Sequence, residues 1–263
     1  MTPAVFRQAS GERFEASDLA RGPWDPRAQH GGAPAALLMR AFERLPGAES
    51  MLLARVTYEL LRPAPLGELD VQAEMVRPGK RVQLLEGSLS TADGTQVVRA
   101  RALRVQAADL DGASPTQVAP PPPGPEAGEE RPPAFTAPAS PTFFPDAIEI
   151  RFVAGAFGGG PATGWFRLKV PLVAGEQPSP LQRLAAAADF GNGISTVLDW
   201  DEHLFINPDL TIYLDREPAG EWICLEARTT IAPDGVGTAE SVLYDQRGRV
   251  GRAIQALLIA PRA

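Results

Sequence analysis

The sequence predicts an α+β fold built from two tandem repeats, in each of which an antiparallel sheet wraps a central helix. The first observation behind this prediction is that the 263-residue chain aligns with itself at a constant offset of 154. Arg62-Pro63 recurs as Arg216-Glu217-Pro218, Glu86 as Glu240 and Gly94 as Gly248 (216 − 62, 240 − 86 and 248 − 94). The second observation is that each copy carries one helix signal followed by a run of strand signals. Two such units are expected to lie side by side.

A proline-rich stretch separates the two copies. Residues 107–141 are rich in Pro, Ala and Glu and include the run Pro120-Pro121-Pro122-Pro123-Gly124-Pro125. This composition is typical of an extended, poorly packed connector. The predicted organisation is therefore an N-terminal repeat over 1–106, a linker over 107–141 and a C-terminal repeat over 142–263.

The N-terminal repeat begins with a weak strand signal over Phe6 to Glu15. A helix is predicted to start near Ala33-Pro34, with proline in the tolerated first turn, and to stop at Pro46-Gly47. An apolar stripe at Leu37, Leu38, Ala41 and Leu45 gives this helix a buried face. Segments rich in β-branched residues and bounded by turn residues then predict strands over 56–61, 69–76, 82–91 and 96–105.

The C-terminal repeat follows the same order. Strands are predicted over 148–154 and 165–170, and a helix opens at Ser179-Pro180, an N-cap followed by a first-turn proline. Four further strands are predicted over 210–214, 222–230, 237–244 and 250–259, with hairpin turns at Pro233-Asp234-Gly235 and Gln246-Arg247-Gly248.

Composition excludes several classes of function. A net charge of −7 argues against the broad basic surface that nucleic acid binding needs. We find no signal peptide pattern and no apolar run long enough to span a membrane, so a cytoplasmic protein is expected. A single cysteine, Cys224, and two histidines, His30 and His203, cannot build a disulfide or a Cys/His metal cage, and we expect no metal and no cofactor.

Asp189 is the residue that most suggests chemistry. It continues the apolar stripe of the second helix, Leu181, Leu184, Ala185 and Ala188, which places a carboxylate on the face that should be buried. Its counterpart at the constant offset is Ala35 (189 − 154). Burial raises a carboxyl pKa towards the range of a general base. The alternative is a carboxylate at a frayed helix end that binds the following turn.

Gln255 is a second candidate. The last strand alternates, and Gln255 is an amide in the row that otherwise reads Gly251, Ala253, Leu257, Ile259. A buried amide needs hydrogen-bond partners, whereas a glutamine at the sheet margin would bond only to backbone or water. Its counterpart at the constant offset is Arg101 (255 − 154), so this position also differs between the copies.

Five ordered segments resemble the double hot-dog acyl-CoA thioesterases related to bacterial thioesterase II. They are Gln29-His30-Gly31-Gly32-Ala33, Leu61-Arg62-Pro63-Ala64-Pro65-Leu66-Gly67, Asp189-Phe190-Gly191-Asn192-Gly193, Asn207-Pro208-Asp209-Leu210-Thr211 and Gly220-Glu221-Trp222. The resemblance covers both repeats and implies a double hot-dog fold. It places the catalytic aspartate at Asp189 and the catalytic glutamine at Gln255. The family's threonine is Asn207 here, a departure that leaves a role in orienting water or a role in the turn with Pro208.

The resemblance implies hydrolysis of acyl-CoA thioesters by water that Asp189 activates and that Gln255 and Asn207 position. His30, Gly31 and Gly32 lie at the start of the first helix, where free backbone N–H groups can hold the substrate oxygen or its oxyanion. The alternative for these glycines is a close approach of the helix to the sheet. Direct attack by Asp189 to form a mixed anhydride also stays open.

Two other functions are weighed against hydrolysis. A protein of the same fold that binds acyl-CoA without turning it over fits the change from threonine to Asn207. A hot-dog hydratase fits less well, because its pattern has an aspartate five residues before the catalytic histidine and Leu198 stands five residues before His203. The basic turn Arg77-Pro78-Gly79-Lys80-Arg81 is either a CoA phosphate contact or only a solvated hairpin. By analogy with other hot-dog proteins a homo-oligomer is expected.

Overall fold

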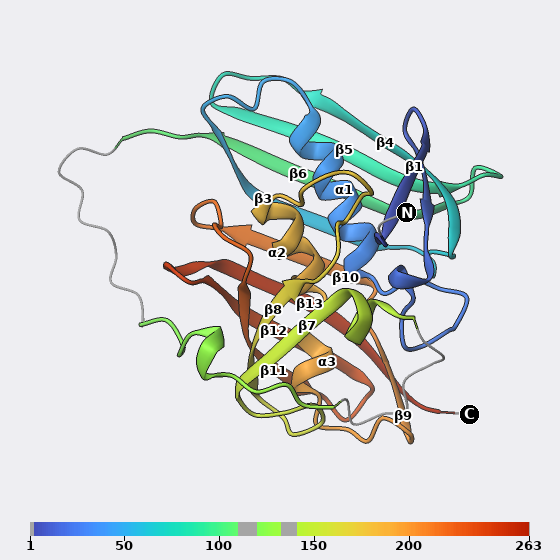
Figure 1. Cartoon of the computed structure of the whole chain (residues 1–263), viewed down its shortest axis with the longest axis vertical. Coiled ribbons are helices and arrows are strands. Elements are labelled where there is room, and N and C mark those ends of the chain that lie inside the picture. The colour runs from blue at the N-terminus through green and yellow to red at the C-terminus, as the bar shows by residue number, and fades with distance from the viewer. Residues whose placement is uncertain (1–2, 110–119, 133–140, 263) are drawn as a thin grey trace.

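The strands of both repeats join into one antiparallel sheet (Figure 1). The structure, a computed structural model, describes residues 3–109, 120–132 and 141–262. Over these residues the sheet has thirteen strands, in the order β1-β2-β4-β5-β6-β3-β10-β13-β12-β11-β8-β7, with β9 paired to β13. The mostly antiparallel sheet with few helices agrees with the predicted α+β class.

The N-terminal repeat contributes six strands and one long helix among the described residues. Its elements are β1 (Phe6–Ser10), β2 (Arg13–Ala16), η1 (Asp18–Ala20), α1 (Gly32–Arg44), β3 (Met51–Leu60), β4 (Gly67–Arg77), β5 (Val82–Thr91) and β6 (Gln96–Gln106). The weak signal at the N-terminus is a hairpin, because Gly11 adopts the left-handed conformation with φ of +52° between β1 and β2. The strand predicted over 82–91 has those bounds, and β3 starts five residues before its predicted start at 56 (56 − 51).

The C-terminal repeat contributes seven strands and two helices to the described part of the chain. Its elements are η3 (Phe143–Ala147), β7 (Ile148–Ala154), β8 (Ala162–Leu168), α2 (Pro180–Ala188), α3 (Gly191–Ser195), β9 (His203–Ile206), β10 (Asp209–Leu214), β11 (Ile223–Ile231), β12 (Val236–Asp245) and β13 (Gly248–Pro261), and η2 (Pro125–Ala127) precedes them in the predicted linker. The predicted N-cap is confirmed, since the Ser179 side chain accepts from the Gln182 amide. The short α3 and β9 were not predicted.

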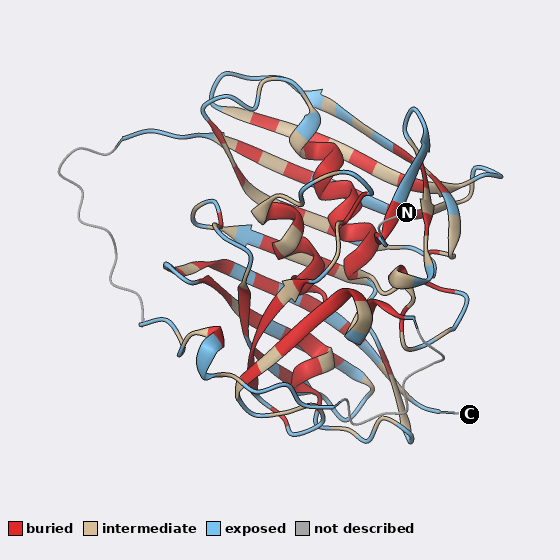
Figure 2. Ribbon diagram, in the orientation of Figure 1, coloured by how far each residue is buried: buried red, intermediate tan, exposed pale blue. Residues whose placement is uncertain are grey.

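The helices lie on one face of the sheet, and the core fills the space between them. α1 packs against α2 and against β4, β5 and β6, while α2 and α3 pack against β8 and β11. Buried residues follow the helices and the inner face of the strands (Figure 2). Gly32 lets the two helices meet closely, because a Cβ at this position would lie 2.4 Å from the Ala186 carbonyl oxygen. The predicted close approach is therefore made to α2 and not to the sheet.

The two repeats meet at the pair β3 and β10. Thr57 lies opposite Thr211, its counterpart in the duplication (211 − 57 = 154), and their hydroxyl oxygens are 3.2 Å apart. The pairs on either side of them, Val56 with Ile212 and Tyr58 with Leu210, are exchanged by the duplication, because Val56 corresponds to Leu210 and Tyr58 to Ile212 (210 − 56 and 212 − 58 both give 154). The approximate twofold axis of the duplication therefore passes between these two threonines.

The constant offset does not hold along the last strand of each repeat. In β6 Arg101 lies opposite Glu86, whereas in β13 the residue opposite Glu240 is Ile254. The structural counterpart of Arg101 is therefore Ile254 (254 − 101 = 153), and that of Gln255 is the buried Ala102. The hairpin that joins β12 to β13 is one residue shorter than the hairpin that joins β5 to β6. A shift of one residue moves a side chain to the other face of a sheet. Pairing Gln255 with Arg101 was wrong.

The offset also fails for the helices. α1 starts at residue 32 and α2 at residue 180, which are 148 apart (180 − 32), so Ala35 lies in the first turn of α1. Asp189 instead follows the last turn of α2, and the helical path is interrupted there before α3 begins. Ala35 and Asp189 therefore do not occupy equivalent places, and their comparison does not bear on the role of Asp189.

Part of the predicted linker packs on the C-terminal repeat. Pro125 is buried, Glu129 bridges to Phe152 of β7, and the Trp165 indole donates to the Pro123 carbonyl at 2.7 Å. The expectation of poor packing is thus wrong for 123–129, while 110–119 and 133–140 lie outside the described residues. Within the ranges that are described, no helix has the length and apolar character needed to cross a bilayer.

An ion pair between Arg216 and Asp245 lies at the end of β12. Arg216 donates to both carboxylate oxygens of Asp245 at 2.6 Å, and the Ala219 and Arg247 amides donate to the same carboxylate. The Asp245 side chain is fully buried. Burial alone would raise its pKa, but the hydrogen bonds from Arg216 and the two amides outweigh burial and lower it.

We expect Asp245→Asn to lower the free energy of unfolding by about 3 kcal/mol, because it leaves the Arg216 guanidinium without a charged partner. Thr91 is the counterpart of Asp245 (245 − 91 = 154) and is the matched control. Thr91→Val should cost less than about 1 kcal/mol in the same urea titration. Equal losses in the two variants would show that the Arg216 pair does not stabilise the fold.

Candidate active site

The last turn of α2 carries the Asp189 carboxylate into a space between the two repeats. Asp189 is the C-cap residue and keeps a helical backbone with φ of −73° and ψ of −10°. Its side chain is only 6% exposed. Gly31, at the N-cap of α1, leaves room for the carboxylate, since a Cβ there would lie 2.7 Å from Asp189 Oδ2. A glycine of one repeat is therefore required to admit the acid of the other.

Two side-chain amides hold one oxygen of this carboxylate. Asn207 Nδ2 donates to Asp189 Oδ1 at 2.8 Å, and Gln255 Nε2 donates to the same oxygen at 3.2 Å. Gln255 Nε2 also lies 3.2 Å from the backbone carbonyl of Asp189. The structure thus brings together the three residues that the sequence suggested for catalysis. With Oδ1 occupied in this way, Oδ2 is the oxygen that remains for a proton.

Gln255 is held rigidly by both ends of its amide. It lies on the inner face of β13 and is 1% exposed, and its Oε1 accepts from the Asn192 backbone amide at 3.2 Å. Its Nε2 donates to Asp189. Because both polar ends are paired inside the protein, Gln255 fixes α3 and Asp189 against the sheet.

Asn207 interrupts a strand. β9 and β10 are the two halves of the counterpart of β3, and the break between them falls at Asn207-Pro208. Proline lacks the N–H that a continuous ladder needs, and the break turns the Asn207 amide toward Asp189. A second contact, from Nδ2 to the Asp209 carbonyl at 3.3 Å, fixes the turn. The contacts of Asn207 therefore include the turn that the sequence suggested, and its role in orienting water stays a prediction.

His30 contacts the other oxygen of the carboxylate. Its Nδ1 lies 3.1 Å from Asp189 Oδ2, and its ring stacks on Phe190 with centroids 4.2 Å apart. Burial lowers the pKa of His30 to about 3, so the ring is neutral at neutral pH and the contact is not a pair of full charges. The Gly32 amide donates to Nδ1 at 3.0 Å. Gly31 N–H, by contrast, has no hydrogen-bond partner among the residues that the structure describes.

Burial dominates the protonation of Asp189. It raises the pKa of Asp189 to about 7, although hydrogen bonds from Asn207, Gly32 and Gln255 to the carboxylate each lower it. A carboxyl group with this pKa exchanges its proton near neutrality. The arrangement therefore suits a general base that must later act as an acid.

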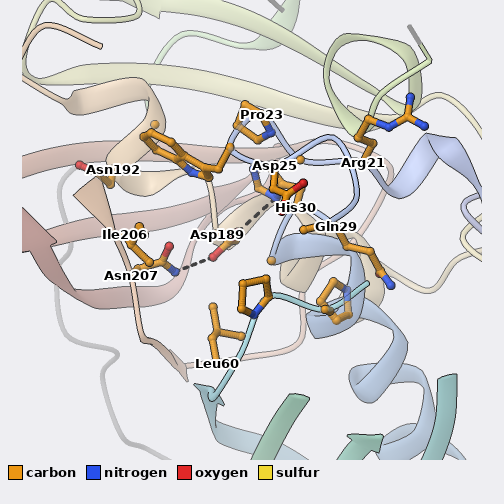
Figure 3. A pocket seen from close by; sticks show the side chains of 18 of the residues that line it. Arg21, Pro23, Asp25, Gln29, His30, Leu60, Asp189, Asn192, Ile206 and Asn207 are labelled. Atoms are coloured by element: carbon orange, nitrogen blue, oxygen red, sulfur yellow. Dashed lines mark hydrogen bonds and ion pairs between the residues drawn. The ribbon is translucent and has the colours of Figure 1, made fainter. Parts of the chain in front are cut away.

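A cavity of about 380 Å³ lies beside Asp189 (Figure 3). Loops from both repeats line it, and Figure 3 shows Asp189 between His30 on one side and Asn207 on the other. Gly31 is among the lining residues and Gly32 is not. The volume falls in the range of pockets that bind small molecules.

The aromatic walls of this cavity were not predicted from the sequence. Trp24 and Trp200 stack with centroids 4.0 Å apart, and Phe205 meets both edge-on. Further lining rings are those of Phe144, Phe157 and Phe190. Nothing in the sequence around Trp24 indicated a partner on the other repeat. These rings give the cavity an apolar surface next to a titratable acid.

Within the described ranges, no group of three or more His, Cys, Asp or Glu side chains is arranged to hold a metal ion. The buried Cys224 lies with Trp165 and Tyr244 in a small separate cluster. Burial raises the pKa of its thiol, which keeps it protonated. Neither feature adds a reactive group to the cavity.

Two family models match the sequence of the chain. The acyl-CoA thioesterase N-terminal domain matches residues 20–105, and the acyl-CoA thioesterase C-terminal domain matches residues 115–259. No curated protein is a significant match.

Several solved structures resemble the whole chain. A provisionally assigned thioesterase II from Thermobifida fusca YX is 19% identical with a TM-score of 0.73, over 99% of this chain and 98% of that one. A hot-dog protein of unknown function from Alicyclobacillus acidocaldarius is 18% identical with a TM-score of 0.73, over 97% and 95%. An acyl-CoA thioesterase II from Mycobacterium marinum is 15% identical with a TM-score of 0.65, over 98% and 95%. At these identities the likeness shows the hot-dog fold alone.

The raised pKa of Asp189 predicts a particular dependence of stability on pH. Between about pH 4 and about pH 7 the native protein holds a proton that an unfolded aspartate has lost, so the contribution of Asp189 to stability falls as pH rises. Asp189→Asn removes this titration. From pH 4 to pH 8 we expect the free energy of unfolding of the wild type to fall relative to the variant by up to about 4 kcal/mol in urea titrations.

His30 acts with the opposite sign, because its depressed pKa makes stability fall as pH drops below about 6.5. Because His30 is present in both proteins, its contribution largely cancels when the free energies of unfolding of wild type and variant are subtracted. Parallel pH curves for wild type and variant would mean that Asp189 titrates normally. Carboxyl ¹³C NMR of the wild type reads the same pKa directly if the variant folds poorly.

Proposed function

We propose that this chain, which belongs to the acyl-CoA thioesterase family, hydrolyses acyl-CoA thioesters to a free acid and CoA. The observation that carries the proposal is a buried carboxyl group with a pKa of about 7 on the wall of an aromatic-lined cavity. The family supports the class of reaction, and the site supports the mechanism that follows.

In the proposed mechanism Asp189 takes a proton from water as the water oxygen attacks the thioester carbon. Asn207 and Gln255 hold Oδ1, so the second oxygen, Oδ2, is directed at the water. The tetrahedral intermediate collapses, the C–S bond breaks, and the proton on Asp189 passes to the leaving thiolate. A pKa near neutrality serves both proton transfers.

The oxyanion of that intermediate needs a donor, and we propose the Gly31 N–H. It lines the cavity and is unpaired among the described residues, whereas the Gly32 N–H is already directed at His30 and at the Asp189 carboxylate. His30, whose Nδ1 accepts from the Gly32 N–H, would then hold the glycine loop beside the carboxylate. The acyl group would lie against the aromatic walls, which offer apolar surface and edge-to-face contacts.

Three alternatives differ from hydrolysis by activated water. If Asp189 attacked directly and water then cleaved the mixed anhydride at the aspartyl carbonyl, a single turnover in H₂¹⁸O would place an enzyme oxygen in the acid, whereas activated water would place the label there at once. An acyl-CoA binder without turnover would give saturable binding and no free thiol. A hydratase has less support, since His203 is not among the residues that line the cavity.

We further propose that the two repeats form a double hot-dog, with boundaries 1–106, 107–141 and 142–263. The pairing of β3 with β10 and the packing of α1 on α2 support this arrangement. A homo-oligomer and a cytoplasmic site of action are also proposals. Exposed apolar side chains on the outer face of β10 and β13, those of Tyr213, Ile254 and Leu258, support contact with a second copy.

Asp189→Asn should lower kcat for acyl-CoA hydrolysis by about a hundredfold or more, because the general base is lost. The measurement is release of free CoA thiol from a panel of acyl-CoAs. The control is Asp199→Asn, a carboxylate that accepts from the Asp201 amide in an exposed turn. Full activity in Asp189→Asn would remove Asp189 from the mechanism.

Asn207→Ala should shift the acidic limb of the kcat/KM profile to higher pH. The Asn207 hydrogen bond favours the carboxylate, so its loss raises the pKa of Asp189 above about 7. Asn207→Thr should recover part of the shift, because a hydroxyl can also donate to Oδ1. A limb that stays in place in Asn207→Ala would mean that Asn207 serves only the turn.

A further inference from the structure

The two copies of one arginine have different surroundings. Arg62 and Arg216 are counterparts (216 − 62 = 154), and each follows the strand at the junction of the repeats, β3 or β10. Arg216 donates to the Gly248 carbonyl at 3.0 Å, and Arg62 donates to the Gln96 carbonyl at 3.1 Å. Both arginines therefore contact the start of the last strand of their repeat.

Only the second copy has a charged partner. The Arg216 guanidinium makes a bidentate pair with the buried Asp245. The counterpart of Asp245 in the first repeat is Thr91, whose hydroxyl contacts Asp93 and the Thr95 carbonyl. Within the described residues no ion pair joins Arg62 to a carboxylate. The first repeat thus keeps the cation and lacks the anion that neutralises it in the second.

Arg62, which has no carboxylate partner among the described residues, lines the cavity. Arg62 is exposed and is one of the lining residues, together with its neighbours Leu61 and Pro63. Arg21, the other arginine of the lining, is already paired with Asp18 at 2.5 Å. Arg62 is therefore the cavity's candidate for binding an anion that comes from solution.

We propose that Arg62 binds a phosphate group of the CoA moiety and holds the leaving-group half of the substrate at the mouth of the cavity. This rests on the proposed function. A guanidinium forks onto two phosphate oxygens, which matches the bidentate geometry that Arg216 shows toward Asp245. The thioester then lies farther in, beside Asp189.

The basic hairpin Arg77-Pro78-Gly79-Lys80-Arg81 does not take this role. β4 leads from Gly67, close to the cavity residue Ala64, to Arg77 at its other end. A strand of this length extends about 35 Å. The charges of the hairpin are therefore at the far edge of the molecule from the cavity.

The test compares two thioesters of one acyl group, one on CoA and one on N-acetylcysteamine, which has no phosphate. In Arg62→Gln we expect the ratio of kcat/KM for the CoA thioester to that for the N-acetylcysteamine thioester to fall about threefold to tenfold, mainly through KM. KM for the CoA thioester should also depend less steeply on salt. The control is Arg99→Gln, an exposed arginine outside the cavity lining, which should keep the wild-type ratio.

A fall of both kcat/KM values by the same factor in Arg62→Gln would overturn the proposal and assign Arg62 to the structure of its loop. A thioester on 4′-phosphopantetheine locates the contact: a ratio that already falls with this substrate places Arg62 on the inner phosphate, and a fall only with CoA places it on the nucleotide. If the wild type cleaves neither thioester, the proposed function fails by itself. Calorimetric titration of CoA into wild type and Arg62→Gln then still tests Arg62, and equal affinities would refute its role.

Discussion

The burial of one carboxylate between the two repeats is the constraint on which the site depends. Asp189 is admitted by a glycine of the first repeat and held by amides from the break between β9 and β10 and from β13. Burial opposes its charge and the amides favour it, and the balance leaves its pKa near 7. Because Gly31 and His30 come from α1 and the loop before it, neither repeat contains the whole site. The acid is tuned by the way the two halves pack.

Small departures from the internal symmetry create that site. A hairpin one residue shorter turns Gln255 inward where its offset partner Arg101 points out. A proline-associated break frees Asn207 from a strand that is continuous in the first repeat. An interrupted helix ends on Asp189. The first repeat lacks these changes and keeps instead the glycine-containing helix start and the Arg62 loop. The duplication thus supplies the scaffold, and local departures from it place the three residues of the candidate site.

Sequence patterns predicted the local features well and the long-range contacts poorly. The helix at Ser179-Pro180 and most strands follow from caps, alternation and turns within a few residues. Asp189 and Gln255 stood out because each is polar in an apolar row. The one-residue shift in the last hairpin was not visible, because glycines in both turns matched at the constant offset. The stacking of Trp24 on Trp200 joins residues 176 apart (200 − 24), and no local pattern indicates such a contact. The contact of His30 with Asp189 also joins residues far apart in the sequence, and no local pattern indicates it either.

The threonine pair at the junction of the sheet has a consequence for how such a chain evolves. Hydrogen bonds between β3 and β10 join the halves side by side, so the peptide that tethers them is not what holds them together. What the tether guarantees is stoichiometry, with one acid-bearing half for every half that supplies the glycine loop. Two identical subunits would have to carry both sets of residues in a single sequence. Fusion removes that compromise, and each half is free to specialise while the seam between them stays the same.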